Sequence, residues 1–353
     1  MRAALYHGRE DVRVEDVDPD PLGSDEVRID VEAAGICGSD LHEYAAGPIF
    51  TPEEAHPMTG VSIPLRMGHE FAGSIVDVGD DVTDHSVGDP VVVNPIRYCG
   101  SCRYCTAGQQ HLCESIALTG VSADGGGFAE RSVVPAASVV PLPESVPLEL
   151  GALVEPFSVA LHAVRQADLT AGDSVAIFGS GPIGLAITQV VRAAGATDLF
   201  VSEPRDARRA RAADLGATAI DPTETEPVRR IKRATDGGVD VAFEVAGIEQ
   251  TYNDAVSSTR RDGTVVIVSM FEAPIETHPN TVVMAERTIE GTMSYTAGDR
   301  HDSEFHSILK LFDDGRLDPE QLVTDTISLE DIVDGFESLR DPESEQIKIL
   351  VEP

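Results

Sequence analysis

The apolar positions of the chain change their spacing near residue 155. Before that point they form short segments that alternate with polar residues, such as Val27, Ile29 and Val31, and glycine or proline interrupts these segments often. Alternation with a period of two is typical of strands that bury one face. The first part of the chain is therefore predicted to be a β-rich domain, either all-β or a partly open barrel.

From about residue 157 to 290 the pattern changes to apolar runs that alternate with helical periodicity. Continuous runs such as 175–178 and 265–268 are typical of parallel strands that are buried on both faces. The predicted order is strand 174–178, helix 182–195, strand 199–203, helix 206–215, strand 218–220, helix 227–235, strand 239–245, helix 249–259 and strand 264–268. This order predicts a doubly wound parallel sheet, and hence an α/β fold.

Beyond residue 290 the pattern predicts two more helices, at 302–314 and 329–340, and a last strand at 346–351. We expect these elements to return to the first domain. A long segment with many prolines, 47–66, is expected to be a loop beside the substrate, because long loops in compact domains are usually functional.

The first turn of the predicted parallel sheet has the sequence Gly179-Ser180-Gly181-Pro182-Ile183-Gly184. The glycines permit a tight turn, close approach of a pyrophosphate and close packing of the helix on the sheet, and the helix N-terminus attracts phosphates. Because the motif follows a strand and opens a helix, it predicts a dinucleotide site.

The next predicted strand ends in an acidic residue, Glu203, nineteen residues beyond Gly184. A carboxylate there accepts a hydrogen bond from the ribose 2′-hydroxyl and repels a 2′-phosphate, which favours NAD. Arg205, Arg208 and Arg209 follow directly. An arginine at this place accommodates a 2′-phosphate, so NADP is the alternative cofactor.

The chain is strongly acidic, with 61 Asp and Glu against 26 Lys and Arg, a formal charge of −35 in 353 residues. This charge repels nucleic acid and anionic membranes, so neither is expected as a partner. Only three lysines occur, and lysine depletion with this acidity predicts a halophilic protein, since concentrated salt screens the self-repulsion. No secretory signal or membrane span is recognised, so we expect a cytoplasmic protein.

Four of the five cysteines lie within fifteen residues, at Cys99, Cys102, Cys105 and Cys113. Four thiolates on one short segment suit a closed, tetrahedral structural zinc site. An iron–sulfur cluster is the chemical rival, but here the fourth cysteine comes late and Glu114, not proline, follows it. A reducing cytoplasm favours metal over disulfides.

The segment 37–70 combines residues of three kinds that bind zinc at catalytic sites. It begins with Cys37 and ends with His69 and Glu70, a thiol, an imidazole and a carboxylate. A strand over 26–37 is predicted to deliver Cys37 at its end, with Gly35 beside it to permit a sharp turn. Alone, Cys37 also suits a small buried apolar residue and His69 a core histidine, so the assignment depends on their occurring together.

Together these motifs resemble the zinc-dependent medium-chain alcohol dehydrogenases over essentially the whole chain, and most closely their butanediol and sorbitol (polyol) branch. The segments that carry the resemblance are 37–44, 47–50, 56–57, 68–71, 151–156, 237–245 and 278–280. The resemblance implies a GroES-like catalytic domain, formed by residues 1–155 and 291–353, and a Rossmann domain, formed by residues 156–290.

The resemblance also implies the roles of particular residues. Catalytic zinc would be held by Cys37, His69 and Glu155, with Glu70 beside the metal, and structural zinc by the four clustered cysteines. Asp40 would hold the far nitrogen of His69. Ser39 would accept the substrate's hydroxyl proton and pass it on towards His42.

The implied activity is hydride transfer between NAD(H) and a secondary alcohol or vicinal diol, with 2,3-butanediol and acetoin as the best candidates. L-threonine 3-dehydrogenase, sorbitol dehydrogenase and glucose dehydrogenase are alternatives, and the cysteine lobe, absent from some butanediol dehydrogenases, favours the polyol and threonine relatives. The non-enzymatic alternative is an inactive nucleotide-binding protein. A homotetramer or homodimer is also implied.

Overall fold

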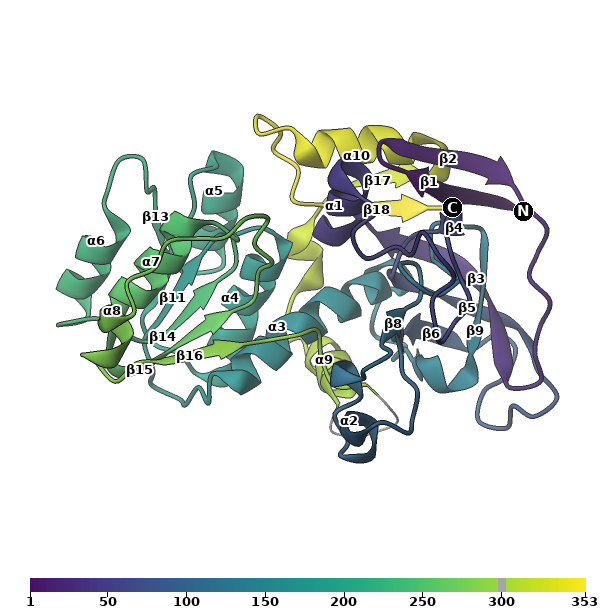
Figure 1. Ribbon diagram of the computed structural model, residues 1–353, viewed down its shortest axis with the longest axis horizontal. Helices are drawn as coiled ribbons and strands as arrows, with labels where there is room; N and C mark the ends of the chain where they lie inside the picture. The colour runs from purple at the N-terminus through teal and green to yellow at the C-terminus, as the bar shows by residue number, and fades with distance from the viewer. Residues whose placement is uncertain (298–302) are drawn as a thin grey trace. The chain divides into compact units, whose positions relative to one another are not determined.

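The computed structural model describes residues 1–297 and 303–353, and these divide into two compact units (Figure 1). Unit 1 contains Met1–Glu155, Tyr295–Gly315 and Val323–Pro353, and unit 2 contains Pro156–Ser294 and Arg316–Leu322. The later part of the chain therefore belongs mainly to unit 1. The predicted first residue of the helix 302–314 lies outside the described residues.

Unit 1 is built mainly from strands. They are β1 (Arg2–Gly8), β2 (Asp11–Asp16), β3 (Glu26–Gly35), β4 (Leu65–Arg66), β5 (Glu70–Val78), β6 (Pro90–Val93), β7 (Ile96–Arg97), β8 (Ala117–Leu118), β9 (Arg131–Pro135), β10 (Val139–Pro141), β17 (Val323–Ser328) and β18 (Lys348–Glu352). A seven-stranded sheet has the order β10-β6-β5-β3-β18-β17, with β9 also paired to β3. Strands β2, β1 and β4 form a second sheet, and β7 pairs with β8.

The helices of unit 1 are α1 (Gly38–Ala46), α2 (Arg103–Thr106), α9 (Glu304–Asp313) and α10 (Ile332–Arg340). Helix α3 (Val154–Gln166) begins in unit 1, and most of its residues belong to unit 2. Strand β3 buries Val27, Ile29 and Val31, as the alternation predicts. They pack in one hydrophobic core with residues of β5, β18 and α10. The apolar face of β3 therefore anchors the centre of the sheet.

The end of the chain joins the first strands of unit 1 (Figure 1, yellow). Strand β18, predicted at 346–351, pairs with β17 in parallel and with β3 in antiparallel orientation. Register places Gly35 opposite both Glu70 of β5 and Leu350 of β18. Three chain segments that are far apart in sequence therefore lie side by side at Gly35.

Unit 2 is a six-stranded parallel sheet with helices. Its elements are β11 (Val175–Phe178), α4 (Pro182–Ala194), β12 (Leu199–Ser202), α5 (Asp206–Asp214), β13 (Thr218–Ile220), α6 (Pro227–Ala234), β14 (Val239–Glu244), α7 (Glu249–Ser258), β15 (Thr259–Ile267), α8 (Asn280–Val283) and β16 (Thr288–Gly291). The strand order β13-β12-β11-β14-β15-β16 reverses direction beside β11. Such a switch point is where open α/β sheets bind ligands, at the carboxyl ends of the strands.

Strand β15 begins five residues earlier than the apolar run predicts. Its first residues are Thr-Arg-Arg-Asp-Gly, and Arg260, Arg261 and Asp262 are exposed. The pairing with β14 also shifts register between Val239 and Val241. Only Thr259 of this part pairs with β14, and pairing resumes at Thr264, so residues 260–263 form an irregular, exposed segment that an apolar-run criterion does not detect.

Within the described residues, we find no helix with both the length and the apolar character needed to cross a membrane.

Gly35 leaves the space that Glu70 occupies. A Cβ atom on Gly35 would lie 2.2 Å from Glu70 Oε2, well inside van der Waals contact. The predicted reason for this glycine, a sharp turn, is wrong, because Gly35 is not among the residues of the chain with positive φ. Gly35 is instead required by the close approach of a buried carboxylate.

Lys348 pairs with that carboxylate inside unit 1. Its Nζ donates to Glu70 Oε2 at 2.6 Å, to Glu70 Oε1 at 2.9 Å and to the Ile36 carbonyl at 2.8 Å, and both side chains of the ion pair are 1% exposed. Burial alone would lower the pKa of Lys348, but the charges of Glu70 and Cys37 outweigh it and raise that pKa. A buried ion pair therefore links β5 to β18.

We predict that Lys348→Ala lowers the free energy of unfolding by about 3–5 kcal/mol, because Glu70 would stay buried without a partner. Lys310→Ala, at an exposed lysine of α9, is the matched control and should change stability by less than about 0.5 kcal/mol. Urea denaturation of both variants measures the difference. Equal midpoints for the two variants would contradict a structural role of the pair.

Candidate active site

Cys37 lies between the end of β3 and the start of α1. Strand β3 ends at Gly35, and Cys37 is the residue before the first turn of α1. The Cys37 backbone N–H donates to Asp40 Oδ2 at 2.9 Å, so a side chain of the helix's first turn fixes the cysteine backbone. Ser39 and His42 follow on the same helix, three residues apart, with His42 exposed.

His69 is held between a glycine and the start of β5. Gly68 has φ +92°, and a Cβ atom there would lie 2.8 Å from the Phe128 backbone nitrogen, so only glycine suits this position. His69 Nε2 lies 3.3 Å from Ser39 Oγ, and Nδ1 lies 3.5 Å from Asp40 Oδ1. The two ring nitrogens thus face different partners, with Asp40 on the side away from Ser39.

The structure brings Cys37, His69 and Glu70 together. Their ligand atoms all lie within 4.8 Å of one another. Glu155, on the first turn of α3, is 7% exposed and is not a member of this group, although its carboxyl group interacts electrostatically with His69 and Glu70. Glu70 is therefore the carboxylate of this group, and the place of Glu155 as a ligand stays a prediction.

The surroundings of His69 favour a bound cation. Burial raises the pKa of Glu155 to about 7, and the charge of Glu70 adds to this effect, whereas His69 and Lys348 oppose it. Burial would lower the pKa of His69, but Asp40 and Cys37 outweigh it and raise that pKa. The thiol, imidazole and carboxylates of the site match the ligands of zinc.

The four clustered cysteines form a second metal-binding arrangement. The sulfur atoms of Cys99, Cys102, Cys105 and Cys113 all lie within 4.8 Å of one another, and all five cysteines of the chain are free thiols. Backbone N–H groups donate to these sulfurs, as from Cys102 to Cys99 at 3.4 Å. Four thiolates this close repel one another unless a cation neutralises them, which fits a closed zinc site.

Backbone N–H groups and burial act in opposite directions on the thiols of this cluster. Hydrogen bonds from the Ser101 and Cys102 backbone lower the pKa of Cys99 to about 6. Burial raises the pKa of Cys105 to about 12. A metal ion would be needed to hold Cys105 as a thiolate at neutral pH.

The glycine-rich loop joins β11 to α4 at the switch point of the parallel sheet. Gly179 has φ +103°, and a Cβ atom on Gly184 would lie 2.1 Å from the Gly179 carbonyl oxygen. Helix α4 begins with Pro182 and Ile183. Beside Gly181 the nearest atom to an added Cβ is Arg208 Nη1 at 3.7 Å, so the backbone is open to a ligand there.

Glu203 lies one residue beyond β12, and its side chain is bonded to the glycine-rich loop. Its Oε2 accepts from the Ser180 backbone at 2.8 Å, and its Oε1 accepts from the Arg205 backbone at 3.0 Å. Burial lowers the pKa of Arg208, and Arg205 lowers it further while Glu203 opposes this. Arg209 forms ion pairs with Asp206 and Asp221, which leaves Arg205 and Arg208 as the arginines free to meet a phosphate.

Three buried charged residues near these sites are missing from the sequence predictions. Lys348 pairs with Glu70; its signal was a lysine inside an apolar strand of a chain with three lysines. Glu43 accepts from the backbone of Ile49 at 3.0 Å and from the Thr51 hydroxyl at 2.7 Å, and so holds the loop after α1. Glu244, at the end of β14, accepts from the backbone of Ala246 and Gly247, which no sequence motif indicates.

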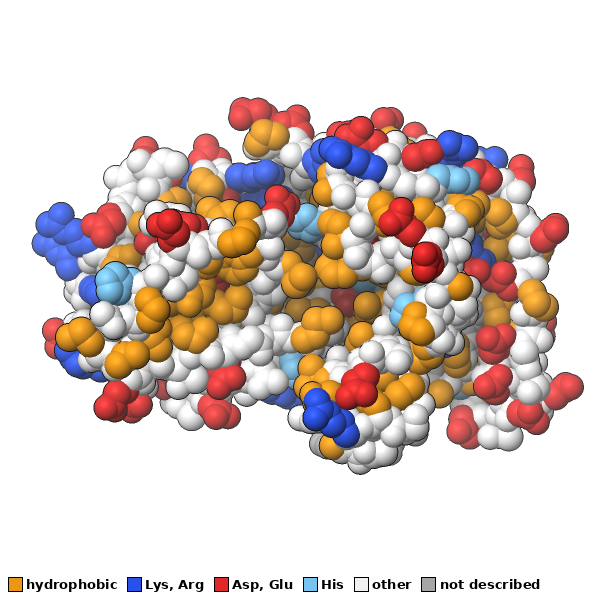
Figure 2. Space-filling model, in the orientation of Figure 1, with side chains coloured by type: hydrophobic (Ala, Val, Ile, Leu, Met, Phe, Trp, Pro, Cys, Tyr) orange, Lys and Arg blue, Asp and Glu red, His pale blue; other side chains and the backbone are white. Residues whose placement is uncertain are grey.

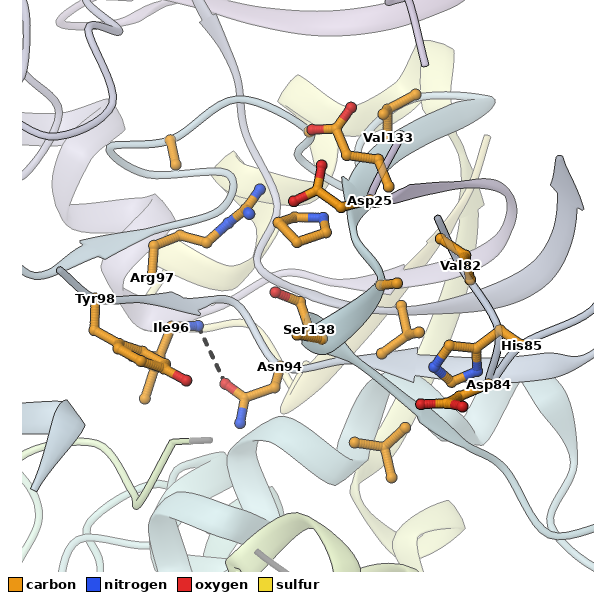
Figure 3. A pocket seen from close by; sticks show the side chains of 18 of the residues that line it. Asp25, Val82, Asp84, His85, Asn94, Ile96, Arg97, Tyr98, Val133 and Ser138 are labelled. Carbon is orange, nitrogen blue, oxygen red and sulfur yellow. Dashed lines mark hydrogen bonds between the residues drawn. The ribbon is translucent and has the colours of Figure 1, made fainter. Parts of the chain in front are cut away.

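Unit 1 also contains a cavity of about 1130 Å³ that none of the predicted site residues lines (Figure 3). Its wall carries Asp25, Asp84, His85 and Arg97, and the Asn94 side chain accepts from the Ile96 backbone at 3.1 Å. Burial lowers the pKa of Arg97 to about 10, although nearby carboxylates oppose this. The mixed charges of this cavity assign no chemistry to it.

Comparison with known proteins agrees with this architecture. Family models match the alcohol dehydrogenase GroES-like domain at residues 23–144 and the zinc-binding dehydrogenase at residues 182–314. (R,R)-butanediol dehydrogenase of Bacillus subtilis (strain 168) is 43% identical over 359 residues, which cover 100% of both chains.

Two solved structures also match the chain. The crystal structure of 2R,3R-butanediol dehydrogenase from Bacillus subtilis has a TM-score of 0.93 at 42% identity and covers 100% of this chain and 99% of its own. A structure described as a zinc-binding dehydrogenase from Sinorhizobium meliloti 1021, bound to NADP, has a TM-score of 0.88 at 30% identity, with 100% and 99% covered.

The chain therefore belongs to the zinc-binding alcohol dehydrogenases, and it is an oxidoreductase. The predicted family is confirmed. The predicted fold class, a GroES-like β-rich part and a doubly wound parallel sheet, is confirmed as well.

We predict that the purified protein holds about two zinc ions per chain, one for each of the two ligand groups. Cys102→Ser should lose one ion and lower the thermal stability, whereas Cys37→Ser should lose the other ion. Elemental analysis by mass spectrometry measures both losses. Unchanged zinc content in Cys102→Ser would contradict a closed site on the four cysteines.

Proposed function

We propose that this protein transfers hydride between NAD(H) and a secondary alcohol or vicinal diol, with 2,3-butanediol and acetoin as substrate and product. The observation that carries this proposal is the 43% identity to a butanediol dehydrogenase over the whole length of both chains, together with the grouping of Cys37, His69 and Glu70. L-threonine, sorbitol and glucose are the alternative substrates, and the four-cysteine group favours the polyol and threonine relatives among them.

In this proposal unit 1 is the catalytic domain, expected at residues 1–155 and 291–353, and unit 2 is the nucleotide-binding domain, expected at 156–290. Cys37, His69 and Glu155 would hold the catalytic zinc, with Glu70, the ion-pair partner of Lys348, beside them. Cys99, Cys102, Cys105 and Cys113 hold structural zinc. When bound, catalytic zinc acts as a Lewis acid that makes an alcohol hydroxyl more acidic.

The protein's own side chains orient the site and move the proton. The carboxylate of Asp40 faces His69 Nδ1 at 3.5 Å and fixes the direction of the ring. Ser39, whose hydroxyl lies 3.3 Å from His69 Nε2, accepts the proton of the substrate hydroxyl and passes it towards exposed His42 on the same helix. The role of the fold is alignment, since the cofactor carries the hydride chemistry.

NAD is the proposed cofactor, with NADP as the alternative. Gly179, Gly181, Pro182, Ile183 and Gly184 would receive the pyrophosphate. Glu203, next to this loop, would accept from the ribose 2′-hydroxyl. Arg208 is the residue that would receive a 2′-phosphate, and the NADP in the Sinorhizobium structure supports keeping this alternative.

We also propose that the protein works in the cytoplasm, at high salt and as a homo-oligomer, either a dimer or a tetramer. The charge of −35 supports the salt requirement, and Figure 2 shows acidic side chains over the surfaces of both units. The exposed apolar side chains of Val283 and Met284, 70% and 74% exposed, support association of unit 2 with another copy.

A panel of vicinal diols, polyols and L-threonine, assayed with NAD and with NADP at high salt, tests the function. We expect the highest kcat/KM with 2,3-butanediol, and Cys37→Ala should have no turnover while it still binds NAD. Normal turnover rates in that variant would contradict the assignment of Cys37 as a ligand of catalytic zinc. Binding of NAD without turnover of any substrate by the wild type would favour an inactive nucleotide-binding protein.

We predict that Glu203→Ala and Glu203→Gln raise the NADP to NAD ratio of kcat/KM by about tenfold, the effect of one interaction of about 1.4 kcal/mol. Glu203→Gln is the conservative variant, because its amide oxygen still accepts from the Ser180 backbone. The ratio is measured by steady-state kinetics with both cofactors. An unchanged ratio in Glu203→Gln would mean that Arg205 and Arg208 decide the cofactor.

A further inference from the structure

A pocket with basic walls lies at one edge of the parallel sheet in unit 2. It has a volume of about 610 Å³, and Lys232, Arg261, His278 and Arg287 contribute to its lining. Lys232 is near the end of α6, Arg261 is near the start of β15, and Arg287 directly precedes β16. Segments from separate crossovers therefore bring these side chains together.

The lining of this pocket contrasts with the rest of the protein. None of its ten lining residues is Asp or Glu, in a chain that has 61 of them and only 26 Lys and Arg. Within the described residues, no carboxylate forms an ion pair with Lys232, Arg261 or Arg287. Figure 2 shows blue and pale-blue side chains close together at the α8 end of this unit. Unpaired positive charges are therefore concentrated at this one pocket, although the protein as a whole is strongly acidic.

Backbone carbonyls hold the two arginines in place. Arg287 donates to the Thr259 carbonyl through Nε at 2.9 Å and through Nη2 at 2.6 Å, and Arg261 Nη1 donates to the Met284 carbonyl at 2.9 Å. Arg287 Nη1 also donates to the Thr281 carbonyl, so three of its five N–H groups are engaged, and each guanidinium still keeps N–H groups for a ligand. Burial lowers the pKa of Arg287, and the charge of Arg261 lowers it further. The guanidiniums therefore repel each other, and a bound anion would remove that repulsion.

This pocket is separate from the proposed dinucleotide site. The strands β11, β14, β15 and β16 are all parallel, and the glycine-rich loop follows the carboxyl end of β11. Gly237, Arg261 and Arg287 instead lie before or near the amino ends of β14, β15 and β16. The two sites therefore lie at opposite edges of the same sheet.

We propose that this pocket binds a multiply charged, phosphate-bearing small molecule. Guanidinium groups present paired donors that match phosphate oxygens, and Lys232 adds a point charge. The Asn280 amide, which also lines the pocket, adds neutral donors. The volume is in the range of small-molecule sites and exceeds what one inorganic ion fills.

Isothermal titration of the full-length protein with sodium pyrophosphate tests the proposal. The titration is done with NAD at saturation, so that pyrophosphate cannot occupy the dinucleotide site, and at constant ionic strength with sodium chloride. We expect one saturable site per chain. Lys232→Gln and Arg261→Gln should each weaken it by roughly tenfold or more, because each removes a charge-assisted hydrogen bond.

Arg233→Gln is the matched control, since Arg233 is the next residue on α6, is exposed and does not line the pocket. Its affinity for pyrophosphate should equal that of the wild type. Absence of saturable binding to the wild type would overturn the proposal. Equal weakening by Arg233→Gln would overturn it too, because it would show attraction by general charge, and circular dichroism confirms that each variant is folded.

Discussion

Buried negative charge is the constraint on which unit 1 depends. The carboxylates of Asp40, Glu70 and Glu155 and the thiol of Cys37 lie close to His69, and these carboxylates are almost fully buried. An unpaired buried ion costs several kcal/mol, so such a group of anions is tolerated only around cations. Lys348 pairs with Glu70, and a cation bound by Cys37, His69 and Glu70 would offset more of the negative charge.

The same constraint explains why the end of the chain returns to unit 1. Glu70 and Lys348 are 278 residues apart, and β18 carries the lysine to the place where β3 ends and β5 begins. Gly35 makes room there for the Glu70 carboxylate, and Gly68, before His69, makes room for Phe128. The β-sheet thus serves as the support that sets the spacing of the ligands.

In unit 2 the geometry of the backbone shapes the proposed site, whereas in unit 1 the charges of side chains shape it. The turn from Gly179 to Gly184 packs the start of α4 against β11 so closely that a side chain on Gly184 would collide with the backbone. Glu203 is bonded to the same turn through the Ser180 N–H. A dinucleotide would therefore meet a loop whose shape is set before binding, which limits the entropy lost on association. At the opposite edge of the sheet, unpaired arginines line the pocket that we propose binds an anion.

Much of the fold could be predicted because local patterns decide it. Period-two alternation identified β3, continuous apolar runs identified the parallel strands, and the spacing of glycines and cysteines identified the loop and the four-thiol group. The start of β15 could not be predicted, since its polar residues form an irregular, exposed segment between two paired positions, Thr259 and Thr264. The reason for Gly35 was wrong, because the atom that excludes a side chain there belongs to β5.

The sequence by itself determined the kinds of ligand present, the order of strands and helices, and the acidic character of the surface, because each depends on residue type or on neighbours along the chain. The tertiary structure alone decided that Glu70 joins Cys37 and His69 in one group, and that Lys348 is the partner of Glu70. It also decided that four basic residues share one pocket. These relations depend on strand register and on desolvation, and both arise only when distant segments pack together.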